Sequence, residues 1–238
     1  MLGTSEELTL PLTDPAPHLK ELIDNLTETE SLLDIHRKVA GNGPGRKYGV
    51  EVLNKSALVL LVACWEAYVE DTVSAALDFM ITNCIDHKVF PKNVLERVGS
   101  TKQGLKSWDL AGDGWKTELR ANMTAILAKT TGLLNTPRAG QVDELFFKVI
   151  GLPNLSSTWK WNNVTSTQIT NRLSDLIATR GAIAHRVKHS DKVYKKTVIE
   201  AAHLIGRLSA RTNNETRTHV HRLIGTYPWP RINFKGTS

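Results

Sequence analysis

The chain has little cysteine, with Cys64 and Cys84 as its only two thiols in 238 residues. Two cysteines are too few for a disulfide framework, and on their own they do not complete a zinc site. Cys64 lies inside an apolar run, which indicates a small core residue. The composition therefore excludes a disulfide-stapled fold and a metal centre formed by cysteines alone.

Long apolar runs are also missing. The longest covers residues 57–65, nine positions, and is bounded by Lys55 and Glu66. A bilayer span needs about 20 such residues. The first basic residue is Lys20 and no apolar run precedes it, so the sequence carries no secretory signal pattern. These absences predict a soluble, cytoplasmic protein without a membrane partner.

Strand-like alternation and internal repeats do not persist anywhere, whereas helical periodicity recurs along the chain. A Gly-rich break at 41–49 lacks the order of a phosphate loop and indicates a connector. The second pattern is apolar on most sides around residues 57–69, as in the central helix of a bundle. The expected helices cover residues 16–40, 50–82, 92–98, 115–130, 141–150, 166–180 and 192–209, with a last turn at 219–224. The fold class is therefore all-α, with an irregular middle at residues 86–114 that contains one proline and four glycines.

Charge is distributed unevenly. The net charge is +6, and residues 178–238 carry 12 Lys and Arg against 3 Asp and Glu, a balance of +9. The first 177 residues consequently sum to −3. A basic segment of this kind suits a polyanionic partner such as RNA, and a solvated helix face explains it equally well.

The basic segment begins with an Arg-x4-His pair, Arg180 and His185, at the end of an inward-facing helical pattern. Arginine is permanently charged and its fork matches a phosphate group. Histidine can donate and accept protons near neutral pH. Together they suit phosphodiester cleavage without a metal or cofactor. The spacing alone is weak, because a surface arginine near a surface histidine produces the same pattern.

Three blocks of the sequence, in a fixed order, strengthen the interpretation of Arg180 and His185 as a catalytic pair. Residues 57–71 carry an apolar run that leads into Trp65, Glu66 and Tyr68. Residues 142–161 form a short amphipathic pattern, a Gly-Leu-Pro turn and a tryptophan-containing loop, and residues 173–185 end in the Arg-x4-His pair. In order and spacing these blocks resemble the RiboL-PSP-HEPN branch of the HEPN superfamily.

The resemblance implies a HEPN-like helical bundle over residues 1–238, with a core at about 47–208, an N-terminal helix and connector at 1–46, and a tail at 226–238. It also implies a homodimer that places two Arg-x4-His pairs in one composite cleft. Endoribonuclease action in a toxin–antitoxin or anti-phage setting is the implied function, with an antitoxin or other system protein as a further partner.

The chemistry of such a site can be stated directly. A base removes the proton of an RNA 2′-hydroxyl, which attacks the adjacent phosphorus and leaves a 2′,3′-cyclic phosphate and a 5′-hydroxyl. His185 is the candidate base or acid, and Arg180 would stabilise charge on the phosphorane oxygens. Residues five apart on a helix lie about 140° apart, so a helix break after Arg180, at Gly181, is expected to bring the pair together.

Further site candidates carry competing interpretations. Glu66 either enters the cleft and orients Arg180 or His185, or forms an ordinary rim salt bridge. The RNA-binding candidates are Arg186, Lys188 and His189, and a solvated basic turn is their alternative. His185 and His189 have the spacing of metal ligands on a helix, but no third ligand accompanies them, so no metal is predicted.

Two tryptophans, Trp159 and Trp161, either stack on bases or close over the core, and the core position is favoured. At the motif itself Gly181 stands where family members usually have Asn or Asp. This departure keeps a second function open, a catalytically silent HEPN module that binds RNA, nucleotide or a partner protein.

Overall fold

The structure, a computed structural model, describes residues 16–40, 49–131, 137–161, 163–185 and 192–232. Within these ranges all the regular secondary-structure elements are helices. The one β interaction in them is an isolated bridge between Trp161 and Val164. The α-helices are α1 (Pro17–Ala40), α2 (Glu51–Asn83), α3 (Lys92–Thr101), α4 (Gly114–Thr131), α5 (Ala139–Ile150), α6 (Ser166–His185) and α7 (Lys195–Ile224). Three 3-10 helices accompany them, η1 (His87–Val89), η2 (Gly104–Leu110) and η3 (Leu155–Thr158). The predicted all-α class is confirmed.

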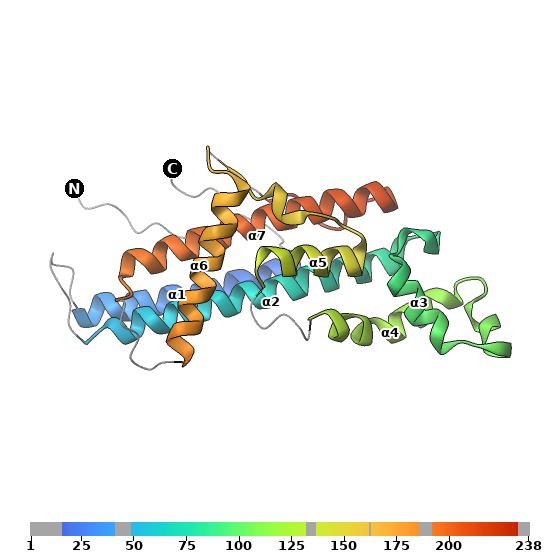
Figure 1. Ribbon diagram of the computed structural model, residues 1–238, viewed down its shortest axis with the longest axis horizontal. Helices are drawn as coiled ribbons and strands as arrows, with labels where there is room; N and C mark the ends of the chain where they lie inside the picture. Colours follow the sequence, from blue (N-terminus) through green and yellow to red (C-terminus); the bar gives the residue numbers. More distant parts are fainter. Residues whose placement is uncertain (1–15, 41–48, 132–136, 162, 186–191, 233–238) are drawn as a thin grey trace.

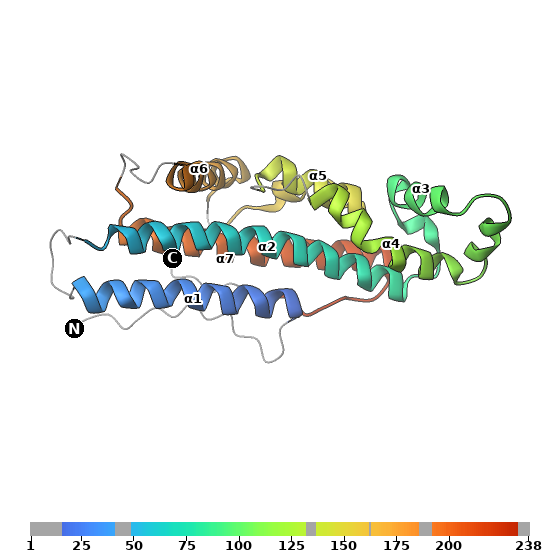
Figure 2. The same cartoon turned by 90° about the horizontal axis from the view of Figure 1, so that it is seen from below.

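Helix α2 is the centre of a layered bundle. It runs beside α7, with α1 on one side and α5 and α6 on the other, while α3 and α4 extend one end of the molecule (Figures 1 and 2). Helix α6 crosses α2 steeply in Figure 1 and is seen almost end-on in Figure 2. The described helices thus cover α2 along most of its length.

Burial of α2 follows from its apolar composition. Its largest side chains, Trp65 and Tyr68, are 0% and 1% exposed, and each places its polar atom on a backbone carbonyl. The Trp65 indole nitrogen donates to the Pro137 carbonyl at 3.0 Å, and the Tyr68 hydroxyl donates to the Ser209 carbonyl at 2.8 Å. Burial raises the pKa of Tyr68, so the ring stays neutral. Large aromatic side chains are thereby buried without an unpaired polar group.

One helix among the described residues is long and apolar enough to cross a membrane, and it is α2. Half of its most apolar window is buried inside the bundle. Its apolar character is therefore explained by its position as a core helix.

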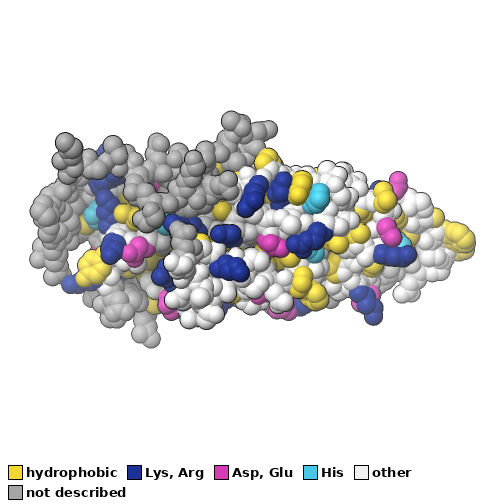
Figure 3. Space-filling view, turned by 90° about the horizontal axis from the view of Figure 1, so that it is seen from above, with side chains coloured by type: hydrophobic (Ala, Val, Ile, Leu, Met, Phe, Trp, Pro, Cys, Tyr) yellow, Lys and Arg dark blue, Asp and Glu magenta, His cyan; other side chains and the backbone are white. Residues whose placement is uncertain are grey.

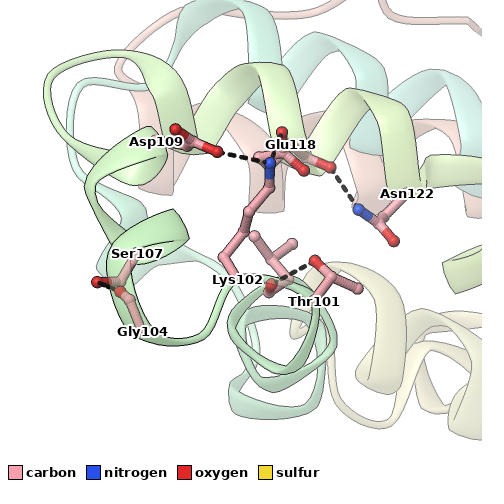
Figure 4. A network of polar contacts seen from close by, with 8 residues as sticks. Thr101, Lys102, Gly104, Ser107, Asp109, Glu118 and Asn122 are labelled. Atoms are coloured by element: carbon pink, nitrogen blue, oxygen red, sulfur yellow. Dashed lines mark hydrogen bonds and ion pairs between the residues drawn. The ribbon is translucent and has the colours of Figure 1, made fainter.

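One lysine links three parts of the irregular middle segment. The Lys102 ammonium, which follows α3, lies 3.0 Å from the Asp109 carboxylate in η2 and 2.9 Å from Glu118 in α4 (Figure 4). These hydrogen bonds raise the pKa of Lys102, with the bond to Glu118 as the largest cause. A single side chain therefore connects three segments that have few buried residues of their own.

Helix α7 differs from the sequence-based prediction. A helix was expected to end at Ser209 and a separate turn to form at 219–224, but one continuous helix runs to Ile224. Residues 210–218 contain few apolar side chains, so the sequence shows no apolar residues at helical spacing in this part of the helix. The inward positions are polar instead, and we call this row the polar seam of α7: Ser209, Thr212, Asn213, Thr216 and His219, all buried.

Three side chains of the polar seam form hydrogen bonds with distant partners, whereas the Ser209 and Thr216 hydroxyls have no hydrogen-bond partner among the described residues. Asn213 Oδ1 accepts from His18 Nε2 at 3.1 Å, and Thr212 Oγ1 accepts from the Trp159 indole at 3.1 Å. His219 Nε2 lies 2.9 Å from the Ile150 carbonyl at the end of α5. Because buried polar groups are costly when unpaired, these bonds fix the register of α7 against α1, α5 and η3.

The chain after α7 returns along that helix. Gly225 ends α7 with φ of 83°, a left-handed conformation that glycine adopts without strain. Asn214 then donates to the Ile232 carbonyl at 2.6 Å and accepts from the Ile232 backbone nitrogen at 3.0 Å. Trp229 is 8% exposed and Ile232 is 2% exposed. The segment expected to be a tail is thus anchored to the bundle as far as Ile232.

The two buried histidines predict how stability depends on pH. Burial lowers the pKa of His18 and of His219, and the hydrogen bonds to Asn213 and to the Ile150 carbonyl oppose this only in part. The unfolded chain takes up protons on these rings near pH 6.5, whereas the folded chain does not. The free energy of unfolding should therefore fall as pH drops below about 6.5, with a slope of at most about 1.4 kcal/mol per pH unit for each histidine.

Urea unfolding between pH 7.5 and 5.5 measures this slope, at pH values above the range where ordinary carboxylates titrate. In a His18→Gln, His219→Gln double variant the slope should become shallower, whatever the absolute stability. An equal slope in the double variant and the unmodified protein would contradict the assignment.

Candidate active site

Helix α6 carries the Arg-x4-His pair and starts at a capping box. Thr165 Oγ1 accepts from the Gln168 backbone nitrogen at 3.3 Å, and Gln168 Oε1 accepts from the Thr165 nitrogen at 2.9 Å. Thr165 is therefore the cap residue, directly before the first residue of the helix. The inward face of α6 is the predicted one, and its buried residues are Ile169, Leu173, Leu176 and Ile177.

Arg180 continues that inward face. It follows Leu176 by four residues and Ile177 by three, so it shares their side of the helix. Its side chain is half-buried, and its Nε atom is buried without a hydrogen-bond partner among the described residues. A guanidinium held this way retains an unused donor close to the core, which is unusual for a structural arginine.

Glu66 of α2 lies within electrostatic range of Arg180. It is half-buried, and burial raises its pKa while the positive charge of Arg180 acts in the opposite direction. No ion pair joins the two side chains within the described part of the chain, so Arg180 is close to Glu66 without being neutralised by direct contact. The structure therefore places these two predicted site residues within electrostatic range of each other.

The acidic face of α2 continues beyond Glu66. Burial raises the pKa of Glu70, and the charges of Glu66 and Asp71 raise it further. Burial and the charge of Glu21 raise the pKa of Asp71. Glu66, Glu70 and Asp71 therefore form one interacting acidic group on α2, and Glu66 is the member whose pKa the charge of Arg180 lowers.

His185 does not meet Arg180 within one chain. Helix α6 continues without interruption through Gly181 to His185, so the predicted break after Arg180 is wrong. On a continuous helix the two residues project about 140° apart. His185 is accordingly exposed, while Arg180 faces α2. Gly181 is regular helix, and a Cβ there would meet no atom within 4 Å, so glycine is not required by packing.

The three predicted RNA-binding residues, Arg186, Lys188 and His189, lie outside the described residues. The predicted core position of Trp159 is confirmed, since its side chain is 0% exposed and stacks edge-on against Trp65 with ring centres 5.7 Å apart. Trp161 is only half-buried, and the Arg207 guanidinium lies 5.7 Å from its ring centre.

An apolar surface beside Glu66 was not foreseen from the sequence. We define the α2 strip as Val52, Val59, Leu60, Ala63 and Ala67, which lie on one side of the helix. Val52 is 63% exposed and Leu60 is 42% exposed. No helix passes in front of α2 in Figure 2, and the C-terminal end of α6 projects past α2 on the same side (Figure 1). The only sequence signal was an apolar pattern on more sides than neighbouring helices could cover.

A groove between α6 and α7 is the second feature that the sequence did not indicate. It has a volume of about 550 Å³ and is lined by Arg172, Asp175, His203, Glu200, Arg207 and Trp161, among others. Neither Arg180 nor His185 lines it. Mixed charges and an aromatic wall make it a polar groove that is separate from the Arg180 region.

The described residues contain no group of three or more His, Cys, Asp or Glu arranged to hold a metal ion. The chemical groups that converge beside α2 are a guanidinium and a carboxylate. Such a pair can bind and polarise a phosphate group, and general acid–base chemistry then depends on a histidine supplied from elsewhere.

Comparison with known proteins places these residues in a wider context. A model of the RiboL-PSP-HEPN family matches residues 20–216, which run from α1 into α7 and include Glu66, Arg180 and His185. No curated protein and no solved structure matches the chain.

The proximity of Glu66 and Arg180 leads to a test that does not depend on activity. Because the positive charge of Arg180 lowers the pKa of Glu66, an Arg180→Ala change should raise that pKa above its value in the unmodified protein. NMR titration of ¹³C-labelled Glu carboxyl groups measures the shift. Arg172→Ala, on the same helix but in the groove, is the matched control and should leave Glu66 unchanged. An unaltered Glu66 pKa in Arg180→Ala would contradict the proximity.

Proposed function

Because the chain belongs to the RiboL-PSP-HEPN family, we propose that it is a metal-independent endoribonuclease. The observation that carries the proposal is Arg180, whose buried Nε has no partner among the described residues and which lies beside a half-buried Glu66. Arginine kept free of an ion pair in a partly desolvated place is suited to a phosphate oxygen. Family membership supports a role connected with RNA.

In the proposed reaction His185 moves the proton of the 2′-hydroxyl or of the leaving 5′-oxygen. Arg180 binds the non-bridging oxygens, where negative charge grows in the transition state. Glu66 orients the guanidinium from α2 as a positioning residue and does not touch the RNA. The products are a 2′,3′-cyclic phosphate and a 5′-hydroxyl, and no metal or cofactor takes part.

The divergence of Arg180 and His185 supports a site shared between two chains. A two-fold axis at the α2 strip would pair small residues, Ala63 and Ala67, and bring each projecting α6 end toward the other chain. His185 of one chain would then complete the site of Arg180 in its partner. We therefore propose a homodimer with Arg180 and His185 acting in trans.

The cell setting is part of the same proposal. We place the protein in the cytoplasm, in a toxin–antitoxin or anti-phage system, with an antitoxin or another system protein as partner. Arg186, Lys188 and His189 would contact the RNA backbone next to the motif.

A second function is supported by one observation. His185 is exposed and points away from Arg180 on a helix that Gly181 does not break. A HEPN module that binds RNA, nucleotide or a partner protein without cutting would need no convergence of the pair. The presence or absence of cyclic-phosphate ends distinguishes this silent module from the nuclease.

Purified protein should cut single-stranded RNA in the presence of EDTA. His185→Ala should lower the rate by about 10²–10⁴-fold, since it removes the proton-transfer group. Arg180→Ala should lower it by about 10²–10³-fold, as expected for loss of a transition-state donor. Single-turnover cleavage and analysis of the RNA ends measure both effects. His203→Ala and Arg172→Ala, matched residues in the α6–α7 groove, should retain activity.

All four variants should keep the helical circular dichroism of the unmodified protein. Cleavage that requires a divalent ion, or that survives both His185→Ala and Arg180→Ala, would remove the proposed mechanism. RNA binding without any cyclic-phosphate product would establish the silent module instead.

The shared site makes the α2 strip necessary for activity. Leu60→Glu places a charge in the middle of the strip and should convert the dimer to a monomer with loss of cleavage. Leu105 is 87% exposed in η2, far from the strip, so Leu105→Glu is the matched control and should stay dimeric and active. Light scattering and cleavage assays at the same micromolar concentration measure the two properties together.

Subunit mixing tests the trans arrangement. An equal mixture of Arg180→Ala and His185→Ala chains should regain roughly a quarter of the wild-type sites, because half of the dimers are mixed and each has one complete site. A monomeric protein that cuts RNA, or a mixture with no recovery, would overturn the shared site.

A further inference from the structure

A second basic surface lies on α7, away from the Arg180 region. Lys and Arg side chains gather over the middle of the face seen in Figure 3, with few Asp or Glu among them. On this outer side of α7, Arg211, Asn214 and Thr218 follow one another at helical spacing. They face away from the polar seam that packs toward the core. The surface is therefore distinct from both the candidate active site and the core.

A pocket of about 300 Å³ opens on this surface, and we name it the arginine pocket. Three arginines line it, Arg211 and Arg217 from α7 and Arg231 from the C-terminal segment. Thr158 of η3 and Tyr227 complete the walls. Three separate parts of the chain thus converge on one small concave site.

The arrangement of Arg217 is fixed before any ligand binds. Its Nε donates to the Trp229 carbonyl at 2.8 Å, and its guanidinium carbon lies 3.5 Å from the Tyr227 ring centre. The opposite face of Tyr227 stacks on His221, with ring centres 3.8 Å apart and an interplanar angle of 14°. Only one of the five N–H donors of Arg217 is used by the carbonyl, so its terminal nitrogens remain for a ligand.

The charge of the pocket is not balanced by its own residues. Its lining carries three arginines and one carboxylate, Glu215, a net charge of +2. Glu215 already pairs with Arg222 at 3.6 Å, outside the lining. No ion pair is formed by Arg211 or Arg231 within the part of the chain that the structure describes. Three guanidiniums at one site repel each other, and a bound anion would relieve that repulsion.

We propose that the arginine pocket binds a phosphomonoester group. Such a group carries a charge of about −1.5 to −2 at pH 7, which matches the net charge of the pocket. Its three acceptor oxygens match the guanidinium donors of the three arginines. A backbone phosphodiester carries a single charge and would leave the pocket under-neutralised. The volume is larger than phosphate alone requires and leaves room for an attached sugar.

Two sources supply this chemistry, a free mononucleotide and the terminal phosphate of an RNA. The inference goes beyond the proposed nuclease function and does not depend on it, because binding can be measured without cleavage. Calorimetry with the full-length protein tests inorganic phosphate and AMP. The Arg180→Ala chain, in which cleavage should be about 10²–10³-fold slower, tests an RNA hexamer with a 5′-phosphate against the same hexamer with a 5′-hydroxyl.

Arg211→Gln and Arg231→Gln should each weaken binding of the phosphorylated probe about ten-fold or more, since each removes charge-assisted hydrogen bonds. Lys196→Gln removes the same charge elsewhere on α7, where Lys196 faces Glu200 at 3.7 Å, and should have no effect. Binding of AMP that inorganic phosphate displaces supports a free nucleotide. Binding of the 5′-phosphorylated hexamer alone supports an RNA end.

Equal affinity for the two hexamers, together with no binding of AMP or inorganic phosphate, would overturn the proposal, because it would show that the surface binds backbone phosphodiesters. Absence of binding by every phosphorylated probe would overturn it as well. So would binding that Arg211→Gln and Arg231→Gln leave unchanged while the thermal stability of both variants matches that of the unmodified protein.

Discussion

The need to cover α2 is the constraint on which the rest of the structure depends. A 33-residue helix with apolar side chains on most sides cannot be satisfied by one neighbour. Helices α1 and α7 lie along it, and α5 and α6 close much of the remaining surface (Figures 1 and 2). Each fully buried large apolar side chain contributes about 1.5–3 kcal/mol, so coverage of most of α2 gives the bundle much of its stability. The positions of α1, α5, α6 and α7 follow from the part of α2 that each of them covers.

The helices that pack against α2 present two kinds of surface to the core. Helix α6 offers an apolar face that ends in Arg180, whereas the second half of α7 offers the polar seam. The apolar face tolerates small shifts, since dispersion contacts are non-directional. The polar seam does not, because bonds such as Tyr68 to Ser209 and Trp159 to Thr212 have fixed geometry. The bundle therefore has a well-defined register along α7, and the arginine pocket is built on the outer side of that same helix.

Sequence patterns predicted the elements whose inward faces are apolar. The central position of residues 57–69, the inward face of α6 and the core position of Trp159 were all accessible from apolar spacing. The continuity of α7 was not, because Thr212, Asn213 and Thr216 are buried by virtue of partners distant in sequence, such as His18 and Trp159. The predicted helix break at Gly181 was wrong because glycine permits a break without imposing one, and the residues before and after it continue the same helix. The α2 strip and both pockets depend on how helices meet, which no single segment encodes.

Because α6 continues through Gly181, the proposed catalysis requires two chains, and activity therefore depends on the concentration of the protein. If Arg180 and His185 face different molecules, a lone chain holds two halves of different sites and no complete one. The amount of active enzyme then rises with the square of chain concentration when chains are scarce, and only linearly once dimers predominate. Such a protein would have little activity at basal expression, and its activity per chain would rise gradually as chains accumulate, without any inhibitor.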